Sequence, residues 1–161
     1  KELIFELLPP GEVIGLPVVI NRRPYPVTAR AQIATSLIAI PSTVLFALVE
    51  VCPSLLKGMM EIMAQRIEQS QRLARSLAHD KVEVRVASAL LALVPRFGRN
   101  GIESAIEISM SRQELADITG ITLETASRVA RGMEGSGIVD LSDISKVKIL
   151  DSKRLAELVS A

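Results

Sequence analysis

The sequence predicts an α+β fold, because apolar residues first follow one another in short extended runs and later repeat at helical spacing. Residues 3–8, 12–20 and 27–40 are apolar runs separated by the turn signals PPG and NRRPYP, and the last run is rich in β-branched residues. These runs predict three or four strands of an antiparallel sheet or barrel. Because so few strands cannot close a barrel, we expect upstream sequence to supply the others.

Composition is typical of a globular protein and argues against several functional classes. Of 161 residues, 48% are hydrophobic and 23% charged, and with three Phe, one Tyr and no Trp the core must be aliphatic. The net charge of +1 gives no electrostatic argument for nucleic acid. The single Cys52 excludes an internal disulfide framework and a multi-cysteine metal site, and it fits a reducing cytoplasm. His79 is the only histidine and no acid–base or nucleophile constellation appears, so we do not expect an enzyme.

Residues 37–55 are apolar enough to resemble a membrane span in hydropathy. Pro41, Glu50 and Pro53 interrupt this stretch, and each would be costly in a spanning helix. We therefore predict no membrane partner and a cytoplasmic location. From Pro41 onward the apolar spacing becomes helical instead.

A long helix is predicted from Pro53, a residue favoured in the first turn, to about Ala78. Its apolar stripe is close to heptad spacing, with Arg66 and Ser70 as polar interruptions. Such a helix is too long to lie within a small core, so it packs either along its own sheet or against a second copy. We favour a homodimer, because polar interruptions often set coiled-coil register. The predicted dimer interface consists of Leu56, Met59, Met63, Ser70, Leu73 and Leu77.

A second helix is predicted over residues 80–98, where apolar residues again recur at helical spacing. Pro95 and Gly98 are expected to end it, and residues 99–108 are expected to form a loop. The predicted buried stripe consists of Val84, Ala87, Leu91 and Val94.

Residues 111–135 have the pattern of two short helices joined by a tight turn. Ser111 and Glu114 form a capping box, which predicts a first helix over about eight residues. Gly120 permits the positive φ of a tight turn, and Thr122 is placed to cap a second helix. Spacing, caps and turn together predict a helix-turn-helix.

The second of these helices would expose positions 124, 127, 128 and 131, which share one face. One interpretation is a solvated surface with a Glu124–Arg128 pair worth about 0.3 kcal/mol. Residues 138–150 favour another, because they predict two strands around a polar turn, which is the wing of a winged helix-turn-helix. In that setting Arg128 would bond guanine, Glu124 would accept from cytosine, and Ser127 would make a smaller base contact.

The wing strands are predicted near 138–141 and 146–150, and a last helix is predicted at 152–159. Lys146 and Lys148 are placed on the wing for contact with a DNA backbone. The full set of predicted backbone contacts consists of Ser111, Arg112, Thr122, Thr125, Arg131 and Lys146.

The chain resembles the CRP/FNR family of bacterial transcription regulators along nearly its whole length. LLPPGEVIG resembles the family's mid-barrel segment, YPVTARA the strand after its phosphate-binding cassette, and CPSLLKGMMEIMAQRI the start of its dimerisation helix. SRQELADITGITLETASRV followed by GIVDL and VKILD resembles its winged helix-turn-helix. The resemblance implies the C-terminal part of a signal-sensing β-roll in residues 1–52, a dimerisation helix in 53–79 and a DNA-binding domain in 80–161.

The resemblance also implies a homodimer that binds double-stranded DNA at palindromic sites. Glu124, Ser127 and Arg128 match the recognition pattern of the FNR branch, whose half-sites contain T-T-G-A. Leu123 stands where the cyclic-AMP-responsive branch has an arginine, which argues against that branch's T-G-T-G-A half-site. RNA polymerase is a further partner that the resemblance allows.

The sensing segment departs from the family's nucleotide-binding pattern. Gly15-Leu16 and Tyr25-Pro26 replace the Gly-Glu pair for the ribose and the Arg-Ser/Thr pair for the phosphate. Without that carboxylate and guanidinium we predict no cyclic-nucleotide binding of the usual kind. Cys52 alone cannot hold an iron–sulfur cluster. Haem stays open, although His79 is better explained as a capping or surface residue, so the cofactor is unknown.

One alternative from another class stays open. Winged helices also serve as scaffolds that bind protein partners, and the chain lacks a basic net charge. The sequence therefore also allows an interaction module without specific DNA contacts.

Overall fold

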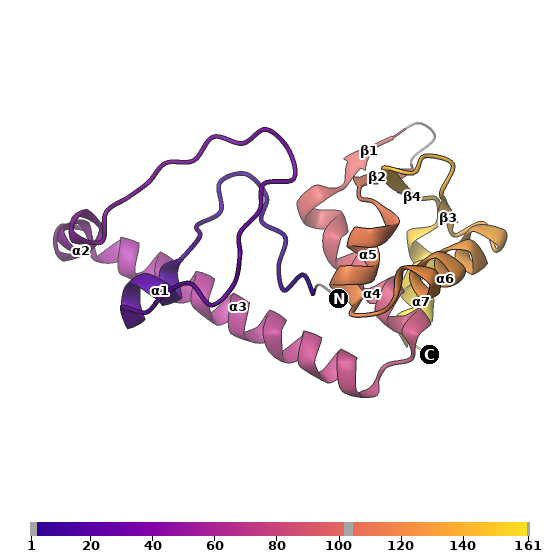
Figure 1. The fold of residues 1–161 in the computed structure, drawn as a ribbon, viewed down its shortest axis with the longest axis horizontal. Coiled ribbons are helices and arrows are strands. Elements are labelled where there is room, and N and C mark those ends of the chain that lie inside the picture. The colour runs from indigo at the N-terminus through magenta and orange to yellow at the C-terminus, as the bar shows by residue number, and fades with distance from the viewer. Residues whose placement is uncertain (1–2, 102–104, 161) are drawn as a thin grey trace. The chain divides into compact units, whose positions relative to one another are not determined.

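The computed structural model describes residues 3–101 and 105–160. Its elements follow the order α1-α2-α3-α4-β1-β2-α5-α6-β3-β4-α7 (Figure 1), which confirms the predicted α+β class. The chain divides into two compact units, Gly11–Gln71 and the combination of Lys1–Pro10 with Arg72–Ala161.

The unit Gly11–Gln71 contains α1 (Leu16–Asn21), α2 (Ser42–Val51) and most of α3 (Pro53–His79). No strand lies within these residues, so the strands expected at 12–20 and 27–40 are wrong. The expected strand at 3–8 is also wrong, because no strand lies among the described residues before α1.

Two physical reasons account for the absence of the expected β-roll strands in this structure. Gly15 adopts a left-handed conformation with φ of 90°, and Pro17 then starts a helix in place of a strand. Residues 22–41 are exposed throughout, so no second layer covers their apolar side chains. An isolated hairpin without such a layer is at best marginally stable in water.

The long helix α3 begins at Pro53 as expected and ends at His79. Arg66 belongs to this unit's packing, because its guanidinium donates to the carbonyl oxygen of Val13 at 2.5 Å and lies 3.9 Å from the Glu12 carboxylate. The residue expected to interrupt a helical seam therefore anchors the segment before α1.

Within the described residues, no single helix is long and apolar enough to cross a membrane. The pair formed by α2 and α3 meets the criterion of length and composition only when joined, and it is bent by 117°.

The second unit contains a four-stranded antiparallel sheet in the order β1-β2-β4-β3. Ile108 pairs with Val147, and Ile106 pairs with Ile149. Ile108, Val147 and Ile149 are almost completely buried on one face of the sheet. The strands are β1 (Arg99–Asn100), β2 (Ile106–Ser109), β3 (Val139–Asp140) and β4 (Lys146–Ile149).

Strands β1 and β2 correct the expectation of a loop at 99–108, of which residues 102–104 lie outside the described part. β2 is stabilised by its pairing with β4, which lies almost forty residues further along the chain. No signal within residues 99–108 reveals that partner. The wing strands β3 and β4 confirm the two strands predicted near 138–141 and 146–150.

Helix α4 (Val82–Phe97) forms where the second long helix was predicted, and of the four residues predicted to be buried only Ala87 is fully buried. Val84, Leu91 and Val94 are only half-buried. α4 packs against several elements at once, namely α5, α6, α7 and β2. The face of α4 that these elements bury is therefore rotated relative to the predicted stripe. The buried residues are Val86, Ala87, Leu90 and Leu93.

Pro95 lies inside α4, and the helix ends within the predicted stretch Pro95–Gly98, with Gly98 as its C-cap. A proline lacks the N–H that would bond one turn earlier, but it tolerates helical φ. The helix continues to Phe97, and the N–H of Gly98 then donates to the carbonyl of Val94 at 2.9 Å.

Three shorter helices surround α4 and the sheet. α5 packs on α6, and α7 packs on α4 (Figure 1). Their buried aliphatic side chains form one core with the buried face of the sheet. The helices are α5 (Arg112–Thr119), α6 (Leu123–Gly135) and α7 (Ser152–Ser160).

Candidate nucleic-acid interface

The start of α5 has the predicted capping box. The Ser111 hydroxyl accepts from the N–H of Glu114 at 3.2 Å, and the Glu114 carboxylate accepts from the N–H of Ser111 at 2.7 Å. Two of the helix's unpaired N-terminal donors are thereby satisfied, and such a cap contributes about 1 kcal/mol. The first helix of the predicted helix-turn-helix begins and ends where the sequence indicated.

The turn after α5 is closed by Gly120, which has φ of 65° and ψ of 30°. The N–H of Ile121 donates to the carbonyl of Ala116 at 3.0 Å. Arg85 of α4 donates to the carbonyl of Thr119, a group at the C-terminus of α5 that lacks a helical partner. Arg85 therefore fixes the turn from outside, and neither its spacing nor its neighbours indicated that role.

Helix α6 is capped by Thr122, whose hydroxyl accepts from the N–H of Thr125 at 3.2 Å. Its core face lies on the opposite side from the predicted contacts and consists of Ala126, Val129, Ala130 and Met133. Glu124 and Arg128 are exposed, and Ser127 is half-buried. We call these three residues the recognition face.

The recognition face is not closed off by an internal ion pair. Among the described residues, no ion pair joins Glu124 to Arg128, so the simple solvated-pair interpretation lacks its main contact. Arg128 also lines an open hollow of about 330 Å³ with Gly132 and the first residues of α4. Arg131 is exposed one helical turn further on.

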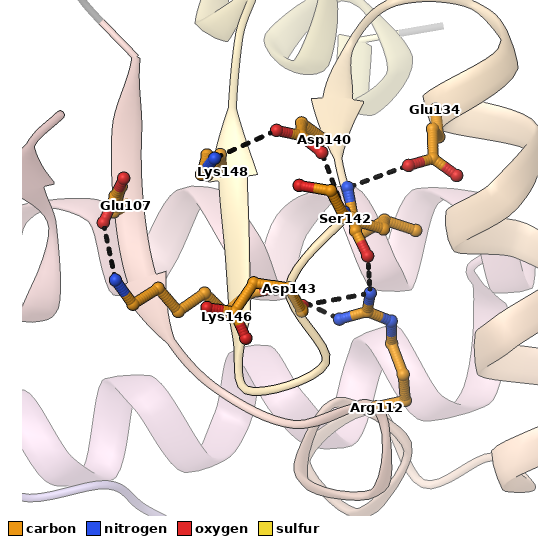
Figure 2. Close-up of polar contacts among 9 residues, drawn as sticks. Glu107, Arg112, Glu134, Asp140, Ser142, Asp143, Lys146 and Lys148 are labelled. Carbon is orange, nitrogen blue, oxygen red and sulfur yellow. Dashed lines mark hydrogen bonds and ion pairs between the residues drawn. The ribbon is translucent and has the colours of Figure 1, made fainter. Parts of the chain in front are cut away.

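Both lysines of the wing form ion pairs within the protein (Figure 2). The ammonium group of Lys146 lies 3.2 Å from the Glu107 carboxylate, and that of Lys148 lies 3.1 Å from Asp140. Hydrogen bonds from Ser142, first from its N–H and then from its hydroxyl, together with Lys148 lower the pKa of Asp140 to about 2. The two wing lysines therefore have acidic partners within the protein.

Arg112 also has intramolecular partners. Its guanidinium donates to the carbonyls of Leu141 at 2.6 Å, Lys146 at 3.1 Å and Asp143 at 3.4 Å. Arg112 and Lys146 were predicted to contact a DNA backbone, and in this structure their polar groups contact the wing and the sheet.

The predicted dimer interface is divided between exposed and covered positions of α3. Leu56 and Leu77 are 46% and 38% exposed. Met59 is 7% exposed in the single chain, and its place in the interface stays a prediction. Ser70 is exposed, and Met63 and Leu73 are half-buried.

Two exposed apolar residues of α3 were missed by the sequence prediction. Met60 and Ile67 are 65% and 55% exposed. Alternating steps of four and three residues give a complete heptad seam, which consists of Leu56, Met60, Met63, Ile67, Ser70, Ala74 and Leu77. Counting that spacing strictly along the sequence would have found it.

Gly15 and Tyr25, which belong to the two stretches that depart from the family's nucleotide-binding pattern, lie together in the structure. The ring and hydroxyl of Tyr25 lie against Gly15 so closely that a Cβ there would overlap them. Leu16 is buried at 3% exposure, and His79 is the exposed last residue of α3. Among the described residues, no group of three or more His, Cys, Asp or Glu is placed to hold a metal ion.

Comparisons with known proteins agree with this architecture. Residues 84–158 match the Crp-like helix-turn-helix domain. The transcriptional activator FnrA of Stutzerimonas stutzeri is 33% identical over 150 residues, which are 92% of this chain and 61% of FnrA. The nitrogen fixation regulation protein FixK of Azorhizobium caulinodans is 30% identical over 138 residues, which are 84% of this chain and 56% of FixK.

Solved structures of CRP/FNR regulators are similar to this chain in fold. A transcriptional regulator of the CRP/FNR family from Thermus thermophilus is 28% identical, with a TM-score of 0.62 over 68% of this chain and 56% of its own. FixK2 from Bradyrhizobium japonicum, at 22% identity and a TM-score of 0.66 over 76% of this chain and 60% of its own, shares the fold. The chain spans about three fifths of the curated relative FnrA. These matches and the geometry of α5 and α6 place residues 84–158 in the Crp-like helix-turn-helix family, and the chain is similar in sequence and fold to transcription regulators of the CRP/FNR family.

Proposed function

We propose that this protein is a sequence-specific DNA-binding transcription regulator that acts as a cytoplasmic homodimer. The observation that carries the proposal is the recognition face on α6, which is exposed beside a capped turn and opposite a buried core face. A second helix presented in this way fits the major groove of B-DNA. Signal sensing by the residues before α3 and contact with RNA polymerase belong to the same proposal.

The chemistry of the recognition face fits a T-T-G-A half-site. The Arg128 guanidinium can donate twice to guanine, and the Glu124 carboxylate can accept from the N4 group of the paired cytosine. Leu123, 45% exposed at the first position of α6, offers an apolar contact to a thymine methyl group. An arginine at that position would instead favour a further guanine.

Backbone contacts would come from the residues around the recognition face. The Thr122 and Thr125 hydroxyls lie 2.8 Å apart at the start of α6, and Ser111 lies at the start of α5. Arg131 adds an exposed cation. Such contacts position a helix on DNA without specifying sequence.

The heptad seam of α3 supports the homodimer. Leu56, Met60 and Ile67 are exposed large apolar side chains on one helical stripe, and pairing with a second α3 would remove them from water. A two-fold dimer would then present two α6 helices to half-sites about one helical turn apart.

Fluorescence anisotropy on a palindrome of two T-T-G-A half-sites, with a scrambled duplex beside it, tests the DNA contacts. Replacing Arg128 with Ala should lower the ratio of specific to nonspecific affinity by about tenfold or more per half-site. Arg131→Ala, the matched control, should weaken binding to both duplexes equally. A Glu124→Ala, Arg128→Ala double variant that still prefers the palindrome would refute the assignment.

Analytical ultracentrifugation tests the dimer. Ile67→Glu places a charge in the seam and should shift the protein to monomer, because two like charges would face each other across the pair. Gln69→Glu adds the same charge at an exposed position of α3 outside the seam and should leave the dimer unchanged. Dimers of equal strength in both variants would show that α3 does not pair through this stripe.

The alternative, a protein-interaction module, is favoured by the net charge of +1 and the ion-paired wing lysines. Salt dependence separates the two functions. Affinity for DNA should fall steeply as salt rises, because phosphate contacts release counterions. Salt-insensitive binding to a protein, without preference for the palindrome, would support the alternative.

A further inference from the structure

We propose that Arg112 and Glu134 are positioning residues that clamp the wing to both helices of the helix-turn-helix. The observation is that two charged side chains hold the two backbone groups of one wing residue, Leu141. Its N–H donates to the Glu134 carboxylate at 2.9 Å, and its carbonyl accepts from the Arg112 guanidinium at 2.6 Å. Arg112 begins α5 and Glu134 lies in the last turn of α6 (Figure 2).

The Arg112 side of the clamp suits a guanidinium and not an ammonium group. The Arg112 guanidinium donates to three carbonyls, those of Leu141 and Asp143 in the turn between β3 and β4 and that of Lys146 at the start of β4. A planar fork with several fixed N–H groups on separate nitrogens can reach these acceptors together, whereas the three N–H donors of a lysine all radiate from one nitrogen. Hydrogen bonds from a charged donor are also stronger than neutral ones.

The hydrogen bond to Leu141 explains why an acidic residue, Glu134, occupies the C-terminal turn of α6. The C-terminus of a helix carries partial negative charge, so a carboxylate in the last turn of α6 is electrostatically unfavourable. The N–H of Leu141 supplies a compensating donor. Glu134 is exposed, so its removal should not disturb the core.

The clamp changes how the wing contributes to the proposed function, on which this part of the inference rests. Lys146 and Lys148 have acidic partners, and the Arg112 donors are directed at carbonyls. The wing therefore carries little unpaired positive charge toward a phosphate. Arg112 would support DNA binding by fixing the wing relative to α6, not by contacting the backbone.

The first test substitutes Glu134 in the full 161-residue chain and follows amide hydrogen exchange by NMR. Glu134→Ala should speed exchange of the Leu141 amide by about tenfold, while Glu134→Gln, which keeps an acceptor oxygen, should stay near the wild type. Glu157→Ala, an exposed acid on α7, is the matched control and should leave Leu141 unchanged. Equal exchange at Leu141 in Glu134→Ala and the wild type would overturn the clamp.

DNA affinity is a second test, because loss of the Glu134 charge and loss of the clamp should change it in opposite directions. Loss of a negative charge near DNA should strengthen binding by electrostatics alone, whereas loss of the clamp should weaken it. We expect Glu134→Ala to bind the T-T-G-A palindrome more weakly than Glu134→Gln does. Tighter binding by Glu134→Ala would overturn the inference.

Arg112→Met tests the other side through the slope of log affinity against log salt. A lost phosphate contact lowers that slope by about 0.9. The clamp predicts weaker binding with an unchanged slope, and faster exchange of the wing amides. A slope lowered by that amount with unchanged wing exchange would make Arg112 a phosphate contact. If the wild type shows no preference for the palindrome, the proposed function fails, and the exchange experiments alone decide the clamp.

Discussion

One substitution, Gly to Ala, should have opposite effects on stability at two positions of the helix-turn-helix. Gly120 has φ of 65°, a left-handed conformation that costs an L-residue about 1–2 kcal/mol. A Cβ there would lie 3.0 Å from a methyl group of Leu77, which is 38% exposed and can move. Alanine also restricts the unfolded chain, which offsets about 0.4–1 kcal/mol of the cost. The expected net loss is about 1 kcal/mol.

Gly132 is the matched control in the interior of α6. It is exposed, and a Cβ there would meet nothing within 4 Å. Alanine is favoured over glycine inside a helix by about 1 kcal/mol. Gly132→Ala should therefore stabilise the unit, and the two variants should differ by about 2 kcal/mol, the sum of the two effects.

Native-state hydrogen exchange measures both changes in the relevant unit. Leu115 and Val147 are buried residues of the common core, in α5 and β4, so their amides should exchange through unfolding of that core. Gly120→Ala should lower their protection, and Gly132→Ala should raise it. A Gly120→Ala variant as stable as the wild type would refute the argument, because no left-handed requirement would then exist at the turn.

Two further predictions concern the core and the wing. Leu155 is fully buried on α7 against α4, so Leu155→Ala should cost about 2–5 kcal/mol, whereas Val159→Ala, 39% exposed on the same helix, should cost about 0.5 kcal/mol or less. Equal losses in urea unfolding would contradict this packing. The pKa of Asp140 is lowered from 3.8 to about 2, so its contribution is present above about pH 4 and is lost as the pH falls toward 2. Asp140→Asn should flatten that acid limb of stability, and an unchanged limb would remove Asp140 as its cause.

The helix-turn-helix could be predicted because its signals are local. The capping box at Ser111, the positive φ at Gly120 and the cap at Thr122 each depend on residues within one or two helical turns. Two helix boundaries follow from equally local features. Helix α3 begins at a proline, and α5 ends just before a glycine. Local hydrogen bonding decides such features before tertiary packing acts.

The sheet could not be predicted in the same way, because strand stability depends on distant partners. β2 was expected to be loop, yet it pairs with β4 across the whole helix-turn-helix. Residues 27–40 are rich in β-branched side chains, yet they stay exposed and unpaired by any strand in the described unit. Both stretches contain β-branched residues, which favour extended backbone. The difference is the presence of an edge and a core to pair with.

The wing shows that cations predicted to contact DNA also have partners within the protein. The sequence shows Arg112 and Lys146 as cations in or near a helix-turn-helix, and a contact with a DNA phosphate was predicted for both on that basis. Main-chain carbonyls and a carboxylate on a neighbouring strand also accept from these cations, but their positions follow only from the folded wing and sheet. Cations with such partners hold the wing in place, while Arg128 and Arg131 remain exposed on α6. In the proposed DNA complex, the electrostatic attraction should therefore be concentrated on α6, the helix that carries the recognition face.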